Sequence, residues 1–79
     1  MRLVDKQIVH IPRWATVVAV TVEDEVPGLV AWIREEDHMM VPRLFRIIET
    51  AHRFSTHGNL VYIGSFQIEN LSAHVFEEQ

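Results

Sequence analysis

Hydrophobic and polar residues alternate along several short stretches of this 79-residue chain, which is the pattern of half-buried β-strands. The clearest stretch is 15–23, which is rich in β-branched residues. Val18, Val20 and Val22 share one face of it, and the opposite face is apolar as well. Two apolar faces indicate a central strand or one covered by a partner subunit. The same alternation predicts further strands at 3–11, 29–35, 60–68 and 71–77.

Turn residues separate these stretches. Val26-Pro27-Gly28 is typical of a turn, because proline fixes φ and glycine accepts a positive φ. Glu69-Asn70 can turn the chain before the last strand. Gly64 lies between two aromatic residues of one predicted strand, where glycine often marks a bulge or a close backbone approach. Regular alternation would put Tyr62 on the same face as Gly64 and Phe66.

The segment 42–56 fits two secondary structures. As a helix it would place Leu44, Ile47, Ile48 and Ala51 along one side, with proline at its first position. As a strand it would set Leu44 and Ile48 against Ile47 on the opposite face. The local pattern by itself favours the helix and leaves the strand open.

Size and composition indicate one domain, 1–79, with a small stability margin. The chain has no cysteine, which excludes disulfides and thiolate metal sites and is compatible with a reducing cytosol. With 48% hydrophobic residues it is too apolar to be disordered. We therefore expect self-association, that is, a homo-oligomer. The charged start is not a secretion signal, and the uncharged apolar run 14–22 is too short to span a membrane, so we expect a soluble protein.

The formal net charge of −4 argues against non-specific binding to duplex nucleic acid, which needs a basic face. The acidic residues form two short runs, 23–25 and 35–37. We expect both runs to be solvated turns, because neither has the spacing of a calcium-binding loop.

Fragments spread over nearly the whole chain resemble, in order, a family of small uncharacterised proteins of tailed bacteriophages and prophages. The fragments are Lys6-Gln7, Ile11-Pro12, Leu29-Val30-Ala31-Trp32, Arg43-Leu44-Phe45-Arg46-Ile47, Thr50-Ala51-His52, Tyr62-Ile63-Gly64-Ser65-Phe66-Gln67 and His74-Val75-Phe76-Glu77. The family's versions of the later pieces resemble T-G-H, Y-I-G-T and H-V-F-E. Ala51 stands where the family usually has glycine, so a positive φ there is in doubt.

The resemblance implies an all-β fold, with a strand over 43–52, and a setting in the host bacterial cytoplasm. It supplies no activity. We therefore predict a mainly β domain, a small antiparallel sandwich or partly open barrel of five to six strands. An α+β fold with a helix at 42–56 is the alternative.

Catalytic and metal-binding patterns are not evident. Five histidines are present, but none is in the H-E-x-x-H arrangement of zinc proteases, and we predict no metal and no cofactor. Ser55, Ser65 and Ser72 are not in an activated-serine motif such as G-x-S-x-G, and we predict that the protein is not an enzyme.

The remaining chemistry suits non-covalent recognition, since aromatic rings can stack and arginines can bind phosphate or carboxylate. We expect a counter-defence binder that sequesters a small anionic, nucleotide-type host signal. A protein-binding inhibitor of a host defence complex and a virion accessory protein are the alternatives. The predicted ligand-binding residues are Arg46, Thr50, His52, Arg53 and Tyr62, and the predicted subunit interface is Trp14, Val18, Val20 and Trp32.

Overall fold

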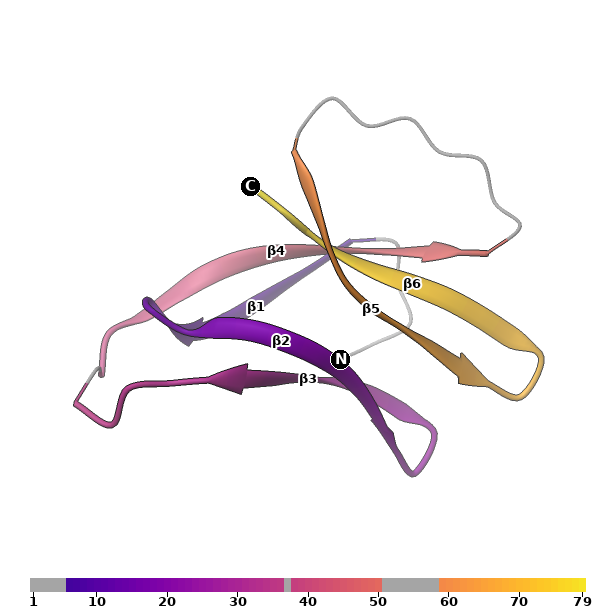
Figure 1. Ribbon diagram of the computed structural model, residues 1–79, viewed down its shortest axis with the longest axis horizontal. Helices are drawn as coiled ribbons and strands as arrows, with labels where there is room; N and C mark the ends of the chain where they lie inside the picture. The colour runs from indigo at the N-terminus through magenta and orange to yellow at the C-terminus, as the bar shows by residue number, and fades with distance from the viewer. Residues whose placement is uncertain (1–5, 37, 51–58) are drawn as a thin grey trace.

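The computed structural model describes residues 6–36, 38–50 and 59–79, which form six β-strands and no helix (Figure 1). The strands are β1 (Lys6–Pro12), β2 (Thr16–Glu23), β3 (Val26–Trp32), β4 (Met40–Glu49), β5 (Leu60–Ile68) and β6 (Leu71–Glu78). The predicted mainly β fold is confirmed. No helix of the described residues is long and apolar enough to cross a membrane.

The strands form two antiparallel sheets. The larger sheet has the order β1-β4-β6-β5, and β2 and β3 form a separate hairpin. β2 lies against β5, so the hairpin packs beside the far edge of the larger sheet. At the opposite edges, β1 and β3 are not paired with each other. A groove of about 390 Å³ lies between them, lined by Gln7, Ile8, Val9, His10, Ile11, Val17, Gly28, Leu29 and Ala31.

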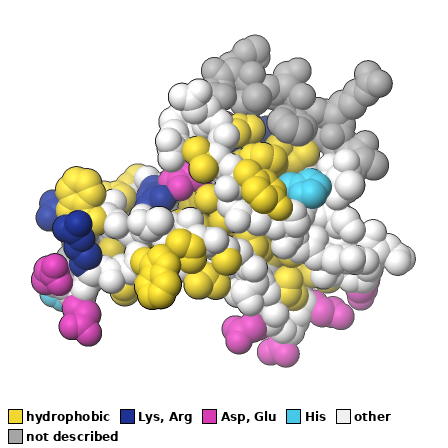
Figure 2. Space-filling view, viewed as in Figure 1, with side chains coloured by type: hydrophobic (Ala, Val, Ile, Leu, Met, Phe, Trp, Pro, Cys, Tyr) yellow, Lys and Arg dark blue, Asp and Glu magenta, His cyan; other side chains and the backbone are white. Residues whose placement is uncertain are grey.

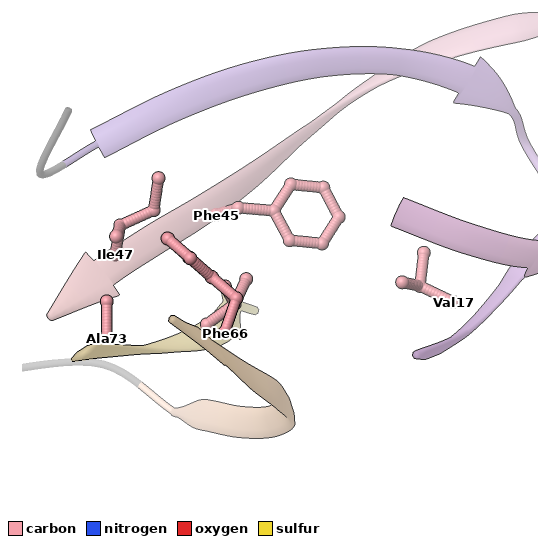
Figure 3. Close-up of a cluster of buried hydrophobic side chains, with 6 residues drawn as sticks. Val17, Phe45, Ile47, Phe66 and Ala73 are labelled. Atoms are coloured by element: carbon pink, nitrogen blue, oxygen red, sulfur yellow. The ribbon is translucent and has the colours of Figure 1, made fainter. Parts of the chain in front are cut away.

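The core is the inner face of the larger sheet, closed by a side chain of the hairpin (Figure 3). Phe45 of β4 and Val75 of β6 are completely buried. They pack in one cluster with Ile47, Phe66, Ala73 and Val17. Phe45 and Ile47 of β4 alternate along their strand, as do Ala73 and Val75 of β6, so these side chains point to the core side of the sheet.

The helix considered for 42–56 is wrong over the part that the structure describes. Residues 42–49 lie in β4, which pairs with β1 on one side and β6 on the other. Thr50 follows in a turn, and residues 51–56 lie outside the described residues. Two neighbouring strands satisfy the backbone of β4 on both sides, which outweighs the local helical periodicity.

The turn predicted at Val26-Pro27-Gly28 is also wrong, because these residues begin β3. The chain turns directly before these residues, at Asp24 and Glu25, whose φ values are 49° and 62°. Two central residues with positive φ make a two-residue hairpin turn whose twist matches that of the flanking strands. Pro27 is tolerated in β3 because this is an edge strand with only one partner.

The first acidic run does contain a turn, as predicted, and Glu69, with φ 52°, turns the chain between β5 and β6 as expected. The strand predicted at 29–35 ends earlier, at Trp32.

Gly64 lies at a β-bulge and at a close approach of two backbones, the two features that its sequence context predicts. The pairing of β5 with β6 shifts between Tyr62 and Gly64, which marks a β-bulge with Ile63 as the extra residue. The backbone there also lies close to β2. A Cβ added to Gly64 would stand 3.3 Å from the backbone nitrogen of Val20 and 3.1 Å from its Cγ2. Glycine at this position allows the hairpin to pack against the larger sheet.

Candidate ligand-binding site

One row of side chains crosses the whole outer face of the larger sheet. Lys6 of β1 is opposite Arg46 of β4, and Arg46 is opposite Phe76 of β6. Phe76 is in turn opposite Tyr62 of β5. Directly paired residues of antiparallel strands share a face, so two cations lie beside two aromatic rings. The rings of Tyr62 and Phe76 are 5.6 Å apart, centre to centre, in an edge-to-face arrangement.

The bulge in β5 decides which residues share this face. Without it, Tyr62 would point to the same side as Phe66, which is buried in the core. The extra residue turns Tyr62 to the outer face, where its side chain is 56% exposed. Ser65, three residues on, reaches the same face and pairs with His74. The face assignment made for Tyr62 from regular alternation is therefore wrong.

A chain of hydrogen bonds extends from Tyr62 across the sheet. The Tyr62 hydroxyl is 2.5 Å from Ser65 Oγ, which is 2.6 Å from His74 Nδ1. On the other side of the imidazole, His74 Nε2 is 3.2 Å from Thr50 Oγ1. Thr50 Oγ1 donates to the backbone oxygen of Ser72 at 3.1 Å. Four side chains from two strands and a turn are thus held in fixed relative positions.

We call Arg46, Thr50, Tyr62, Ser65, His74 and Phe76 the outer-face cluster. In Figure 2 a histidine side chain is visible over β6, beside a group of hydrophobic side chains. Arg46 Nη1 also bonds Glu78 Oε1 at 3.3 Å. The cluster offers aromatic surface, hydroxyl and imidazole hydrogen-bonding groups, and a guanidinium beside Lys6.

Arg43, three residues before Arg46 on β4, has its side chain on the inner side of the sheet. Its Nε and Nη2 donate to the two carboxylate oxygens of Glu77 at 2.5 and 2.6 Å, and its Nη1 donates to the backbone oxygen of Ala15 at 2.5 Å. The hydrogen bond to the Glu77 carboxylate raises the pKa of Arg43, against the opposing effect of burial. Arg43 therefore ties β4 and β6 to the segment before β2.

Comparison with known protein families matches residues 1–79 to a domain of unknown function, DUF7352. The chain belongs to this family. No protein of curated function and no solved structure matches the chain. The family's description contains no statement about phages, so the bacteriophage setting stays a prediction.

Three of the five predicted ligand-binding residues of this DUF7352 chain, Arg46, Thr50 and Tyr62, lie in the outer-face cluster. His52 and Arg53 lie outside the described residues. Sequence reasoning missed Ser65, His74 and Phe76 as members. Alternation along 71–77 could have placed His74 and Phe76 on one face, whereas Ser65 joins them only because of the bulge.

The predicted interface residues divide into two groups. Trp14, Val18 and Trp32 are exposed. Val20 instead lies partly buried against the core of its own chain. Arg13 lies over the Trp14 ring, 5.5 Å from its centre.

Large hydrophobic side chains gather where β1 and β3 end. The Arg13 nitrogen donates to the Met39 backbone oxygen, and Trp32 is opposite Thr16 at the start of β2. We call this group the apolar end; it comprises Trp14, Trp32, Ile33, Met39 and Met40, each more than half exposed.

Metal ligands are not grouped anywhere in the described residues, where no three His, Asp or Glu side chains could hold an ion together.

Proposed function

We propose that this protein is a non-enzymatic binder that sequesters a small anionic ligand of the nucleotide type on its outer-face cluster. The observation that supports this best is the single row of Lys6, Arg46, Phe76 and Tyr62 across four strands. Neighbouring strands are about 4.8 Å apart, so the row extends over roughly 14 Å. A flat base can contact the aromatic half while a phosphate reaches the cationic half.

Electrostatics oppose this binding at long range and favour it locally. The net charge of −4 repels anions. At physiological salt, however, charges are screened over about 8 Å, so the nearest cations dominate. The Arg46–Glu78 pair is 3.3 Å long and partly exposed, and such pairs contribute little stability. A phosphate can therefore replace the Glu78 carboxylate at the Arg46 guanidinium.

We place this binder in a bacteriophage counter-defence role in the host cytoplasm, acting as a homo-oligomer. The support for the setting is the resemblance of ordered fragments, from Lys6-Gln7 to His74-Val75-Phe76-Glu77, to small phage and prophage proteins. Stoichiometric binding suits a short chain for which we predict no catalysis. The captured molecule would be a nucleotide-type host signal.

Calorimetry against a panel of cyclic and linear nucleotides tests the proposal. The unaltered protein should release heat with at least one of them. Arg46→Gln and Tyr62→Ala should each weaken that binding by roughly ten-fold or more, since each removes one charged or aromatic contact. Arg34→Gln is the matched control, because Arg34 is an exposed arginine beyond the end of β3. Absence of heat with every nucleotide would reject the proposal.

A second function, binding to a host defence protein or to the virion, is favoured by the apolar end. Trp32 and Ile33 are 74% and 61% exposed there, and the acidic residues Glu35 and Glu36 follow directly. At this end of the molecule Figure 2 shows hydrophobic side chains next to Lys or Arg side chains, with acidic side chains beyond them. In this case Trp32→Ala would abolish the protection of an infecting phage, and Arg46→Gln would leave it intact.

A further inference from the structure

With a neutral His74 imidazole, the hydrogen-bond chain of the outer-face cluster has one consistent direction. A backbone oxygen can only accept a hydrogen bond, so the single hydroxyl proton of Thr50 is donated to the Ser72 backbone oxygen. Thr50 Oγ1 must then accept from His74 Nε2, which lies 3.2 Å away. The proton of the neutral imidazole is therefore on Nε2, and Nδ1 is left with a free lone pair.

The hydrogen-bond directions on the Nδ1 side of the His74 ring follow from this tautomer. Ser65 Oγ lies 2.6 Å from the bare Nδ1, so the Ser65 hydroxyl donates to His74. Since Ser65 then has no further proton, the Tyr62 hydroxyl donates to Ser65 Oγ at 2.5 Å. The chain runs from Tyr62 through Ser65 and His74 to Thr50 without conflict.

We infer that Ser65 is a reactive nucleophile toward activated acyl groups, with His74 as its general base and Thr50 as the residue that positions the base. A serine hydrogen-bonded to a histidine whose tautomer is fixed by a third group has the arrangement of activated serines. Ser65 and His74 are directly opposite each other on β5 and β6, so the pleat holds them in register. Ser65 is exposed and therefore open to a reagent. This property goes beyond reversible binding, which needs no nucleophile.

The reaction with an aryl ester balances as follows. Ser65 Oγ bonds to the acyl carbon while its proton passes to His74 Nδ1, and the bond from that carbon to the aryl oxygen breaks. The aryl oxide leaves, the acyl group remains on Ser65, and the imidazolium returns its extra proton to water. No oxidant, metal or further reactant is required.

Labelling with p-nitrophenyl acetate, followed by peptide mass spectrometry, tests the inference. We expect one acetyl group on Ser65, formed before acetylation at any other serine. Ser65→Ala should remove it. Thr50→Val should slow acetylation of Ser65 at least about ten-fold. This is less than the roughly 10²–10⁴-fold that a positioned general base contributes, because the site is exposed.

Two further variants separate this role from a general effect on the fold. Thr50→Ser restores a hydroxyl and should recover the rate of the unaltered protein. Ser72→Ala keeps the backbone oxygen that binds Thr50 and should acetylate Ser65 at the unaltered rate. Acetylation of Ser65 no faster than of Ser72 in the unaltered protein, or equal rates at Ser65 with threonine and valine at position 50, would overturn the inference.

Discussion

Gly64 is the residue on which the packing of the hairpin against the larger sheet depends. A methyl group there would meet Val20 at 3.1–3.4 Å, at backbone as well as side-chain atoms. We expect Gly64→Ala to lower the free energy of unfolding by about 1–2 kcal/mol through overpacking, measured by urea denaturation. The matched control is Gly28→Ala, whose new methyl would lie 3.6 Å from Thr21. Equal losses for both variants would contradict this account.

Arg43 and Glu77 form the ion pair that stabilises the inner side of the sheet. Glu77 is 7% exposed and binds two nitrogens of Arg43. Removing one partner leaves a buried charge uncompensated, so Glu77→Gln should destabilise the fold by about 2–4 kcal/mol. Glu78→Gln breaks the more exposed pair with Arg46 and should cost at most about 1 kcal/mol. Comparable losses for the two substitutions would show that burial does not set the difference.

The pH dependence of Arg43's contribution follows from its pKa. The hydrogen bond to Glu77 raises that pKa in the folded state. A raised pKa of a cation gives stability that is fully present below the unfolded pKa and is lost only above the folded one. The folded and unfolded pKa values of Arg43 both lie above about pH 10. The stability difference between the unaltered protein and Arg43→Met should therefore be equal at about pH 7 and about pH 10 in urea denaturation. A smaller difference at the higher pH would contradict the sign.

At the scale of single residues, the sequence predicts ligand binding at Arg46, Thr50 and Tyr62, because arginine, threonine and tyrosine supply groups that bind anions. The structure brings these three side chains to one face, and ligand binding there stays a prediction. The sequence does not single out their neighbours Ser65 and His74, because neither lies in a catalytic motif. The hydrogen bond between Ser65 and His74 depends on cross-strand pairing, and pairing is a tertiary property that local patterns do not encode.

At the scale of elements, the β2–β3 turn carries strain that glycine would relieve. Asp24 and Glu25 both have positive φ, which costs a non-glycine residue about 1–2 kcal/mol. Glu25→Gly should raise the free energy of unfolding by about 0.5–1 kcal/mol, after the added entropy of the unfolded chain is subtracted. Glu36→Gly, in a turn without positive φ, should give no gain in the same denaturation experiment. A loss of stability in Glu25→Gly would contradict the strain.

Element boundaries were predicted where turn chemistry was ordinary and missed where it was not. Glu69-Asn70 behaved as expected. Asp24-Glu25 carries no glycine or asparagine, the usual signs of this turn type, so the sequence predicts the turn at Val26-Pro27-Gly28 instead. In β4 the spacing of Leu44, Ile47 and Ile48 fits a helix, whereas the alternation along the same segment fits a strand. Partners distant in sequence, β1 and β6, decided the outcome.

At the scale of the whole molecule, the described residues expose more large hydrophobic side chains than they bury hydrophobic ones, twelve against eight. Such exposure is typical of a surface that associates. We expect light scattering coupled to size exclusion to give a mass above that of one 9.2 kDa chain. Trp32→Ser, at the 74% exposed tryptophan, should shift the mass towards a single chain without loss of circular dichroism. Tyr62→Ser, on the outer face of the larger sheet and away from the apolar end, is the control. A stable single-chain mass for the unaltered protein would refute self-association.

The overall fold class could be predicted because alternation and β-branched residues are signals averaged over many positions. The order β1-β4-β6-β5 and the separate hairpin could not, because several strand orders bury the same apolar residues. The candidate site depends on that order. Only when β6 lies between β4 and β5 does Phe76 connect Arg46 with Tyr62.

The central claim is that the outer-face cluster is where this protein binds its ligand. Amide NMR spectra, recorded while cyclic and linear nucleotides are added, test it most directly. The account predicts shifts at Arg46, Tyr62, Ser65 and His74, with the indole signal of Trp32 unchanged. Spectra that no nucleotide alters, or shifts confined to the apolar end around Trp32, would contradict it.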